Sequence, residues 1–368
     1  MVLVKAKRDE LLGPLSAVSG IIERRHTLPI LSNVLIERGA GAISFLATDI
    51  EIQITSRGVV EPAGEARSLT VGARKLVDIL RALPESAEVT LQQQDKRLLV
   101  KAGKSKFVLQ TLPAEDFPRL AKPAGDVAGF SLKQKEFRRL LGLVQYSMAQ
   151  QDIRYYLNGL LMVVEDKTLK LIATDGHRLA YASMALDAKL PRQEVIVPRK
   201  TVLELGKLLS DNDADVRVEL SATQASFSFG TVELVSKLVD GKFPDYTRVI
   251  PVGHKNQLSI GREVLRQALM RAAILSNEKF RGVRWVLTDG SLKIVSSNTE
   301  QEEAEEMLEV AYKGDALDIG FNVNYLLDVL NNVAGSEVEC WFGDAASSAL
   351  LSFPSEADFK YVVMPMRI

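Results

Sequence analysis

Three short stretches contain residue types that could perform chemistry at the spacing of known motifs. Gly103, Lys104 and Ser105 match the last three residues of a phosphate-binding loop. Asp175 and His177 could be two members of a hydrolytic triad, and residues 300–306, EQEEAEE, could offer carboxylates to a metal ion. Each stretch must meet the remaining requirements of its motif before it predicts an enzyme.

All three motifs are incomplete. A phosphate-binding loop needs a glycine five residues before Gly103, where the sequence has Leu98, and a helix start where residues 103–109 alternate like a strand. No G-x-S-x-G turn supplies a nucleophile for Asp175 and His177, which instead predict a turn. The acidic run lacks the glycine and the alternate spacing of a calcium loop, and the three histidines lie far apart. We predict no catalytic residue, no metal site and no cofactor.

Basic residues are concentrated in four segments with helical periodicity, although the whole chain is nearly neutral. Residues 73–83, 131–148, 199–210 and 262–275 together hold thirteen Lys or Arg against four Asp or Glu, while the chain of 368 residues has a net charge of −1. If these helices shared one face, that face would suit a polyanion. Charged, solvated helix faces are common, so the charge count leaves that alternative open.

The segments that carry these charges recur three times along the chain. Strand-like stretches at 43–54, 169–183 and 292–306 are each interrupted at an equivalent place, and the interruptions are about 125 residues apart. Each copy has two helical patterns, at 8–22 and 73–83, 133–148 and 199–210, and 262–275 and 322–333. Strands follow the first helical pattern of each copy, at 30–37, 156–164 and 282–289.

The repeat predicts an α+β fold of three similar domains, each made of two halves that combine a helix with an antiparallel sheet. Connectors that contain proline and glycine place the domains at residues 1–124, 128–250 and 256–368. The chain is too long for one ordinary core. One cysteine, Cys340, no apolar run of membrane-spanning length and no signal-peptide pattern predict a cytoplasmic protein.

Seven separated motifs resemble those of the bacterial DNA sliding clamp family, the beta subunit of the replicative DNA polymerase III. They are RRHTLPILSN (24–33), QDIRYYLNG (151–159), ATDGHRLA (173–180), SKLVDGKFPDY (236–246), AILSNEKFRGVR (273–284), EQEEAEE (300–306) and YVVMPMR (361–367). They occur in the family's order over the whole chain. The resemblance implies a processivity factor that performs no bond chemistry and tethers replication enzymes to DNA.

The resemblance also implies a head-to-tail homodimer of crescent-shaped subunits that closes into a ring around duplex DNA. Twelve helices would form the inner wall, and each first domain would contact the partner's third domain. The dimer interface maps to Lys75, Lys104, Lys106, Phe107, Leu109, Ile274, Leu275, Glu302, Glu303, Glu305 and Glu306. The apolar members would carry most of the stability, and the charged members would set the register.

Two sets of binding residues follow from the same resemblance. Non-specific contacts to DNA, which permit sliding, map to Arg25, Gln151, Tyr155, Tyr156, Arg199 and Lys200. A cleft between the second and third domains would capture short peptide motifs from the clamp loader, polymerases and repair proteins. Its lining maps to Leu157, Thr174, His177, Arg178, Leu179, Pro244, Arg248, Val249, Asn322, Tyr325, Ser348, Val362, Met364, Pro365, Met366 and Arg367. Flexible methionines suit a site that accepts several partners.

The residues alone leave several alternatives open. Tyr155 and Tyr156 could be core aromatics, and the last eight residues could be a buried strand in which Val362 and Val363 alternate between the inside and the outside. A nuclease that uses the acidic run with a metal is the main competing function, although its acids lie in one contiguous run. An adaptor that does not touch DNA is a third function, which the basic helices argue against.

Overall fold

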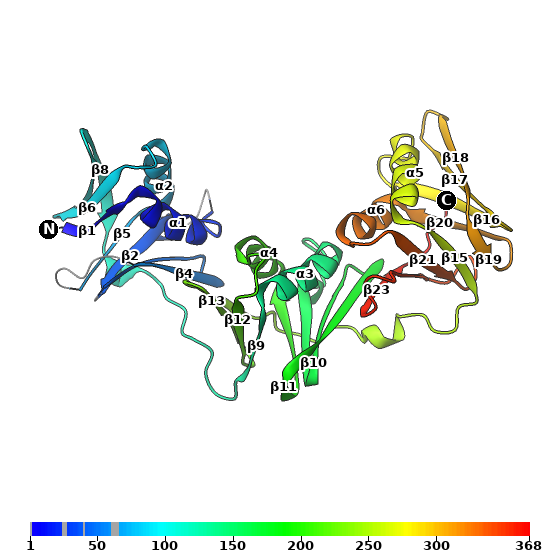
Figure 1. The fold of residues 1–368 in the computed structure, drawn as a ribbon, viewed down its shortest axis with the longest axis horizontal. Helices are drawn as coiled ribbons and strands as arrows, with labels where there is room; N and C mark the ends of the chain where they lie inside the picture. The colour runs from blue at the N-terminus through cyan, green and yellow to red at the C-terminus, as the bar shows by residue number, and fades with distance from the viewer. Residues whose placement is uncertain (1, 24–27, 40, 60–65) are drawn as a thin grey trace. The chain divides into compact units, whose positions relative to one another are not determined.

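The computed structural model describes residues 2–23, 28–39, 41–59 and 66–368, which form two compact units (Figure 1). One unit contains Met1–Phe137 and Leu203–Leu238, and the other contains Arg138–Val202 and Val239–Ile368. Helices α3 (Gln134–Val144) and α4 (Arg199–Leu208) contribute residues to both. The described residues contain six α-helices, and none of these is long and apolar enough to cross a membrane.

A twelve-stranded antiparallel sheet forms most of the first unit. Its strands are, in spatial order, β1 (Val2–Lys7), β6 (Glu88–Gln94), β7 (Arg97–Ala102), β8 (Ser105–Leu112), β5 (Arg67–Gly72), β2 (Asn33–Gly39), β3 (Ala42–Thr48), β4 (Ile52–Val59), β14 (Val232–Lys237), β13 (Gln224–Phe229), β12 (Asp215–Leu220) and β9 (Ala128–Lys133). Helices α1 (Arg8–Ser19) and α2 (Ala73–Ala82) pack beside each other and against these strands (Figure 1). The pairing of β4 with β14 joins the first two copies of the repeat in one sheet.

The second unit contains two antiparallel sheets and the helices α5 (Arg262–Ile274) and α6 (Val323–Asn332), which pack beside each other. The larger sheet has the order β10 (Gly159–Thr174), β11 (Arg178–Pro198), β23 (Phe359–Val363), β22 (Ala349–Ser352), β21 (Glu337–Phe342), β15 (Asn256–Gly261) and β19 (Ala311–Lys313). The smaller sheet has the order β18 (Glu303–Glu309), β17 (Ser291–Ser297), β16 (Gly282–Thr288) and β20 (Leu317–Asn322). The pairing of β11 with β23 joins the second and third copies of the repeat.

All six predicted helical segments contain an α-helix, so the prediction is confirmed. Their apolar residues fall on one face, which packs against the core. In α2, the buried residues Ala73, Leu76, Val77 and Leu80 follow the spacing of an amphipathic helix, and α6 has the same spacing. Helix α2 follows β5 directly and α6 follows β20 directly, so each helix lies next to the sheet that its apolar face covers. These equivalent placements agree with the threefold repeat.

Two predicted strand starts are wrong. Residues expected at the beginning of strands at 30–37 and 156–164 instead form short 3-10 helices, Pro29–Ser32 and Tyr155–Leu157. Proline at the start of the first of these helices has no backbone N–H to donate to a strand partner, and its fixed φ suits a helical turn. The regular strands begin only at Asn33 and Gly159.

The open alternative of a buried terminal strand applies to β23, and neither Val362 nor Val363 faces the outside, because both side chains are fully buried. Strand β23 lies inside the seven-stranded sheet, between β11 and β22. Val362 faces a core cluster that includes Leu157 and Leu179. On the other face of β23, α6 covers the strand, and the Tyr361 hydroxyl donates a hydrogen bond of 2.8 Å to the carbonyl oxygen of Tyr325 in α6.

Candidate functional site

A cavity of about 400 Å³ opens on the second unit, where β10, β11, β23 and the 3-10 helix Tyr246–Arg248 meet. This volume is within the range of sites that bind small ligands or short peptide segments. Residues from the second and third copies of the repeat line it together. The lining residues are Arg154, Tyr156, Leu157, Thr174, Gly176, Arg178, Leu179, Phe243, Pro244, Tyr246, Arg248, Val249, Ser348, Val362 and Met364.

The floor of the cavity is apolar and belongs to the core of the unit. Leu157, Leu179, Phe243 and Val362 are buried in one cluster, and Tyr246 packs against it. The register of the sheet explains how distant residues meet here, because Leu179 in β11 pairs with Val362 in β23. Beyond β23, Met364 is 46 % exposed. The cavity therefore combines a rigid floor with one exposed, flexible methionine in its wall.

Arg178 supports the cavity from one side through several directed contacts. Its guanidinium donates hydrogen bonds to Asp328 (2.6 Å), Asp175 (3.0 Å) and the carbonyl oxygen of Tyr146 (2.7 Å). The same group lies over the ring of Tyr325, 4.4 Å from its centroid. Burial opposes the charge, but contacts with Tyr361 and the two aspartates hold the pKa of Arg178 above its usual value. Arg178 therefore connects the turn after β10 to α6.

Two further arginines lie at the edge of the cavity and are more exposed. Arg154 forms an ion pair of 2.8 Å with Asp152, and its hydrogen bonds hold the pKa of that carboxyl down to about 2. Arg248 forms an ion pair of 3.0 Å with Asp245 and has 86 % of its side chain exposed. An exposed ion pair is easily exchanged for another carboxylate partner. The edge of the cavity can therefore offer charge to a bound acidic group.

Ten of the sixteen residues predicted for the cleft line this cavity, and six do not. His177 contributes its backbone carbonyl, which accepts a hydrogen bond of 2.9 Å from the Met364 N–H. Tyr325 stacks on Arg178, and Asn322 caps α6 by accepting a hydrogen bond from the Asn324 N–H. The remaining three, Pro365, Met366 and Arg367, follow Met364 along the chain and lie beyond the lining.

Five lining residues were not predicted for the cleft. Phe243 and Tyr246 belong to the motif SKLVDGKFPDY, and Gly176 belongs to ATDGHRLA, so the resemblance contained a signal for them. Arg154 and Tyr156 lie in QDIRYYLNG, which the resemblance connected with DNA. The resemblance placed only Leu157 of this segment in the cleft, and the structure shows that Arg154 and Tyr156 border the cavity as well.

Five of the six residues predicted to contact DNA are described, and Arg25 lies outside the described residues. Gln151 and Tyr155 are exposed in the segment before β10, and Tyr155 packs edge-on against Tyr156 with ring centroids 5.9 Å apart. The exposure of Tyr155, at 57 %, argues against a core role for it. Tyr156 is half-buried and lines the cavity.

Backbone contacts bring Arg199 and Lys200 next to this tyrosine segment. The Arg199 N–H donates to the carbonyl oxygen of Asn158 at 3.0 Å, and its guanidinium donates to that of Met148 at 3.1 Å. Burial and the nearby charge of Arg178 lower the pKa of Arg199. The start of α4 and the segment before β10 therefore form one local surface that contains these predicted DNA contacts.

Most of the residues predicted for the dimer interface lie on or beside two strands, β8 in one unit and β18 in the other, while Lys75 lies in α2, and Ile274 and Leu275 lie at the end of α5. Strand β8 pairs with β7 over residues 105–110 and with β5 only at Thr111 and Leu112, so residues 105–110 have one unpaired edge. Strand β18 is the edge of the four-stranded sheet. Ile274, at the end of α5, is 76 % exposed. Unpaired strand edges readily accept a strand from another chain.

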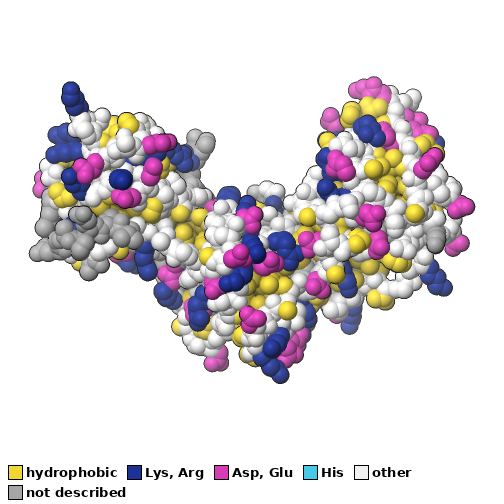
Figure 2. All heavy atoms as spheres, viewed as in Figure 1, with side chains coloured by type: hydrophobic (Ala, Val, Ile, Leu, Met, Phe, Trp, Pro, Cys, Tyr) yellow, Lys and Arg dark blue, Asp and Glu magenta, His cyan; other side chains and the backbone are white. Residues whose placement is uncertain are grey.

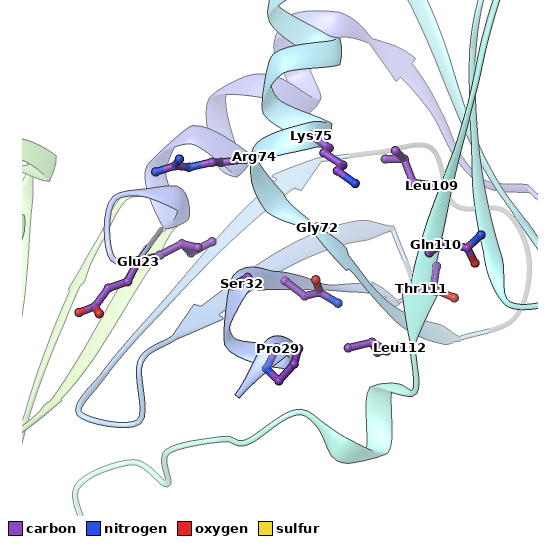
Figure 3. A pocket seen from close by; sticks show the side chains of 12 residues that line it. Glu23, Pro29, Ser32, Gly72, Arg74, Lys75, Leu109, Gln110, Thr111 and Leu112 are labelled. Carbon is purple, nitrogen blue, oxygen red and sulfur yellow. The ribbon is translucent and has the colours of Figure 1, made fainter. Parts of the chain in front are cut away.

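A second cavity, of about 330 Å³, lies beside the β8 edge. Figure 3 shows Arg74 and Lys75 of α2 on one side of it and residues 109–112 of β8 on the other, with Pro29 and Ser32 below. Lys75 and Leu109, both predicted for the dimer interface, therefore share one hollow.

Several of the charged side chains that were assigned to a partner from the sequence form ion pairs within the chain. Figure 2 shows Lys and Arg side chains interleaved with Asp and Glu over the visible face. Among the helical cations, Lys135 pairs with Asp213 and Arg271 pairs with Glu306, each at 2.6 Å. Glu305 pairs with Lys293. Glu305 and Glu306 are therefore already paired within one chain, and the residues that the structure describes show no ion pair for Glu303, Lys104 or Lys106.

Comparison with known proteins gives matches over nearly the whole chain. Family models of the DNA polymerase III beta subunit match at residues 3–121 for the N-terminal domain, 131–245 for the central domain and 247–367 for the C-terminal domain. The beta sliding clamp of Pseudomonas aeruginosa is 48 % identical over 98 % of this chain and 99 % of that protein. The beta sliding clamp of Escherichia coli K12 is 46 % identical with the same coverage.

Solved structures agree with this result. A crystal structure of the sliding clamp from Pseudomonas aeruginosa bound to griselimycin is 47 % identical, covers 100 % of both chains and has a TM-score of 0.95. The Caulobacter crescentus polymerase III beta structure is 37 % identical, covers 100 % of both chains and has a TM-score of 0.94. The predicted three-domain α+β fold is confirmed, and a dimeric ring is known for this family.

The absence of a complete catalytic motif and the match over three successive domains have one explanation. The chain belongs to the family of the DNA polymerase III beta subunit, the beta sliding clamps, whose members are non-catalytic processivity factors for DNA polymerase.

Proposed function

We propose that two copies of this chain close head-to-tail into a ring around duplex DNA, and that the cavity lined by Leu179 and Met364 captures peptide segments of replication and repair proteins. The observation that carries the proposal is this cavity, with its apolar floor and cationic edge, built from two copies of the repeat. The partners are DNA polymerases, the clamp loader and repair proteins, and the compartment is the cytoplasm. The domains divide at residues 1–124, 128–250 and 256–368.

The dimer forms when the β8 edge of one chain meets the β18 edge of the other. Lys104 and Lys106 on one edge face Glu303 on the other, and these charges set the register more than they stabilise the contact. Ile274 and Leu275 of the second chain bury their side chains against Phe107 and Leu109. The hollow beside Lys75 gives Ile274 a place to insert, since its side chain is largely exposed in the single chain.

DNA passes through the ring and is held loosely. Transient contacts with phosphates and bases are made by Gln151, Tyr155, Arg199 and Lys200. Such contacts are independent of sequence, so they allow the protein to slide. Their common surface beside the start of α4 supports this assignment. The second candidate function, a nuclease, has no support from the acidic run, because Glu305 and Glu306 are each paired with a basic side chain.

Griselimycin provides a defined probe for the cavity. A clamp that is 47 % identical to this chain was crystallised with it, and we propose that this chain binds it in the cavity lined by Met364. Deletion of residues 364–368 should abolish binding of both griselimycin and DNA polymerase III, measured by isothermal titration and by pull-down of the polymerase. The mass in analytical ultracentrifugation should remain that of a dimer, because the dimer edges lie elsewhere. Monomers, or unchanged binding, would show that the assignment is wrong.

A further inference from the structure

Two glycines lie on the outer face of the four-stranded sheet, Gly282 in β16 and Gly320 in β20. Gly320 pairs with Arg284 and Gly282 pairs with Asn322, so these four positions share one face of the sheet. The alternate position, Val283, is buried on the other face. Glycine within a strand weakens the sheet and often marks a place where another segment approaches closely.

Residues 366–368 occupy the space that side chains at the two glycines would fill. A Cβ atom on Gly320 would lie 2.5 Å from the carbonyl oxygen of Met366 and 2.7 Å from Cδ1 of Ile368. A Cβ atom on Gly282 would lie 3.2 Å from Cδ1 of Ile368 and 3.6 Å from the sulfur of Met366. The clash would be severe at Gly320 and moderate at Gly282. Alanine at these two positions should therefore displace residues 366–368 to different extents.

Two backbone hydrogen bonds fix the course of this segment between the cavity and the sheet. The Met364 N–H donates to the carbonyl oxygen of His177 at 2.9 Å, and the Met366 N–H donates to that of Gly320 at 2.8 Å. Figure 1 places this end of the chain next to β20. Ile368 is 66 % exposed, so deep burial does not hold the segment. The segment is held in place by the space left at the two glycines and by the hydrogen bond from the Met366 N–H to the carbonyl oxygen of Gly320.

We propose that Gly282 and Gly320 form a seat for residues 366–368, and that this seat positions Met364 in the wall of the cavity. The proposal rests on the function proposed above for the cavity. Held at Gly320, residues 364–366 enter the binding reaction already ordered, so a ligand does not have to immobilise them. The glycines are positioning residues, because they lie outside the cavity lining and act through Met366 and Met364.

The seat is tested first by the methyl NMR signals of Met364 and Met366, assigned by substituting each with leucine. Gly320→Ala should shift both signals. Gly282→Ala should shift the Met366 signal by a smaller amount than Gly320→Ala does. Gly39→Ala is the matched control, because a Cβ on that strand glycine meets no atom within 4 Å. Unshifted signals in Gly320→Ala, with the fold intact by circular dichroism, would overturn the seat.

The effect on the cavity is tested with griselimycin on the dimeric protein. Gly320→Ala should weaken binding roughly tenfold, the change expected when one backbone hydrogen bond and its ordering effect are lost, whereas Gly39→Ala should leave the affinity unchanged. Ile368→Ala, which leaves the sheet untouched, should weaken binding by a smaller factor. Shifted methyl signals with an unchanged affinity would overturn the positioning role.

A double-mutant cycle connects the glycine to the side chain that it accommodates. Gly282→Ala and Ile368→Ala should be non-additive in griselimycin affinity, because they act on the same contact. Additive effects would overturn the contact as the cause. If the wild-type chain fails to bind griselimycin, the proposed function of the cavity is contradicted, and the methyl signals alone decide whether the seat exists.

Discussion

At the scale of single residues, the site depends on side chains whose partners come from distant parts of the chain. Arg178 follows β10 in the sequence, yet its ion-pair partner Asp328 lies in α6. The resemblance placed Arg178 in the cleft, but no sequence pattern could show that its guanidinium donates hydrogen bonds to Asp175, Asp328 and Tyr146. These contacts give Arg178 a structural role, because they connect the turn after β10 to α6.

Arg178→Lys should destabilise the protein by about 2 kcal/mol, because lysine keeps the charge but cannot reproduce the three directed hydrogen bonds of a buried guanidinium. Chemical denaturation monitored by fluorescence measures this change. Arg217→Lys is the control, since the ion pair of Arg217 with Glu219 is exposed on β12. Equal stability of the two variants would remove the structural role given to Arg178.

Cys340 should react slowly with thiol reagents in the folded protein. It is fully buried, and burial raises the pKa of its thiol to about 12, so almost no thiolate exists at pH 8. Because the unfolded thiol has an ordinary pKa, rising pH above about 9 should favour unfolding through this group. Rapid labelling by Ellman's reagent at pH 8 without denaturant would contradict this picture.

Neutralising Arg199 and Lys200 with glutamine should weaken DNA binding and reduce the slope of log affinity against log salt by roughly one to two units. The reason is that each phosphate contact releases counterions. Fluorescence anisotropy with labelled duplex at several salt concentrations measures the slope. Arg217→Gln should leave the slope unchanged, and an unaltered slope in the double variant would place Arg199 and Lys200 away from DNA.

At the scale of elements, helices were predictable and strand edges were only partly so. The apolar face of α2 could be read from the spacing of Leu76, Val77 and Leu80, because a helix uses local periodicity. The burial of both Val362 and Val363 could not, because it depends on strands β11 and β22 lying on either side. The alternation of residues 103–109 predicted the strand β8, but its unpaired edge depends on how little of it pairs with β5, which the alternation does not show.

Leu109→Asp should convert the dimer to monomers, because it places a charge among the apolar side chains that are proposed to hold the two strand edges together. Sedimentation at micromolar concentration measures the mass. Val2→Asp is the matched control, since Val2 is 46 % exposed on the edge strand β1 of the same sheet, separated from β8 by β6 and β7. A dimer that survives Leu109→Asp would place the interface elsewhere.

At the scale of the whole molecule, the threefold repeat could be predicted because copied patterns of about 125 residues are visible in the sequence. The cavity could not be derived from the pattern alone, because it forms where residues from two copies meet across β11 and β23. A ring that encloses DNA does not need to bind it strongly. Ion pairs within the chain neutralise part of the positive charge of the helices, which is compatible with weak DNA binding.

Retention on circular DNA tests this enclosure most directly. Labelled protein is loaded onto a nicked plasmid by its clamp loader and passed through a gel-filtration column, before and after one restriction enzyme opens the circle. Enclosure predicts that the protein elutes with the circular plasmid even at high salt and is lost once the DNA is linear, because a ring slides off a free end. Equal retention on circular and linear DNA, abolished by salt in both cases, would contradict the account.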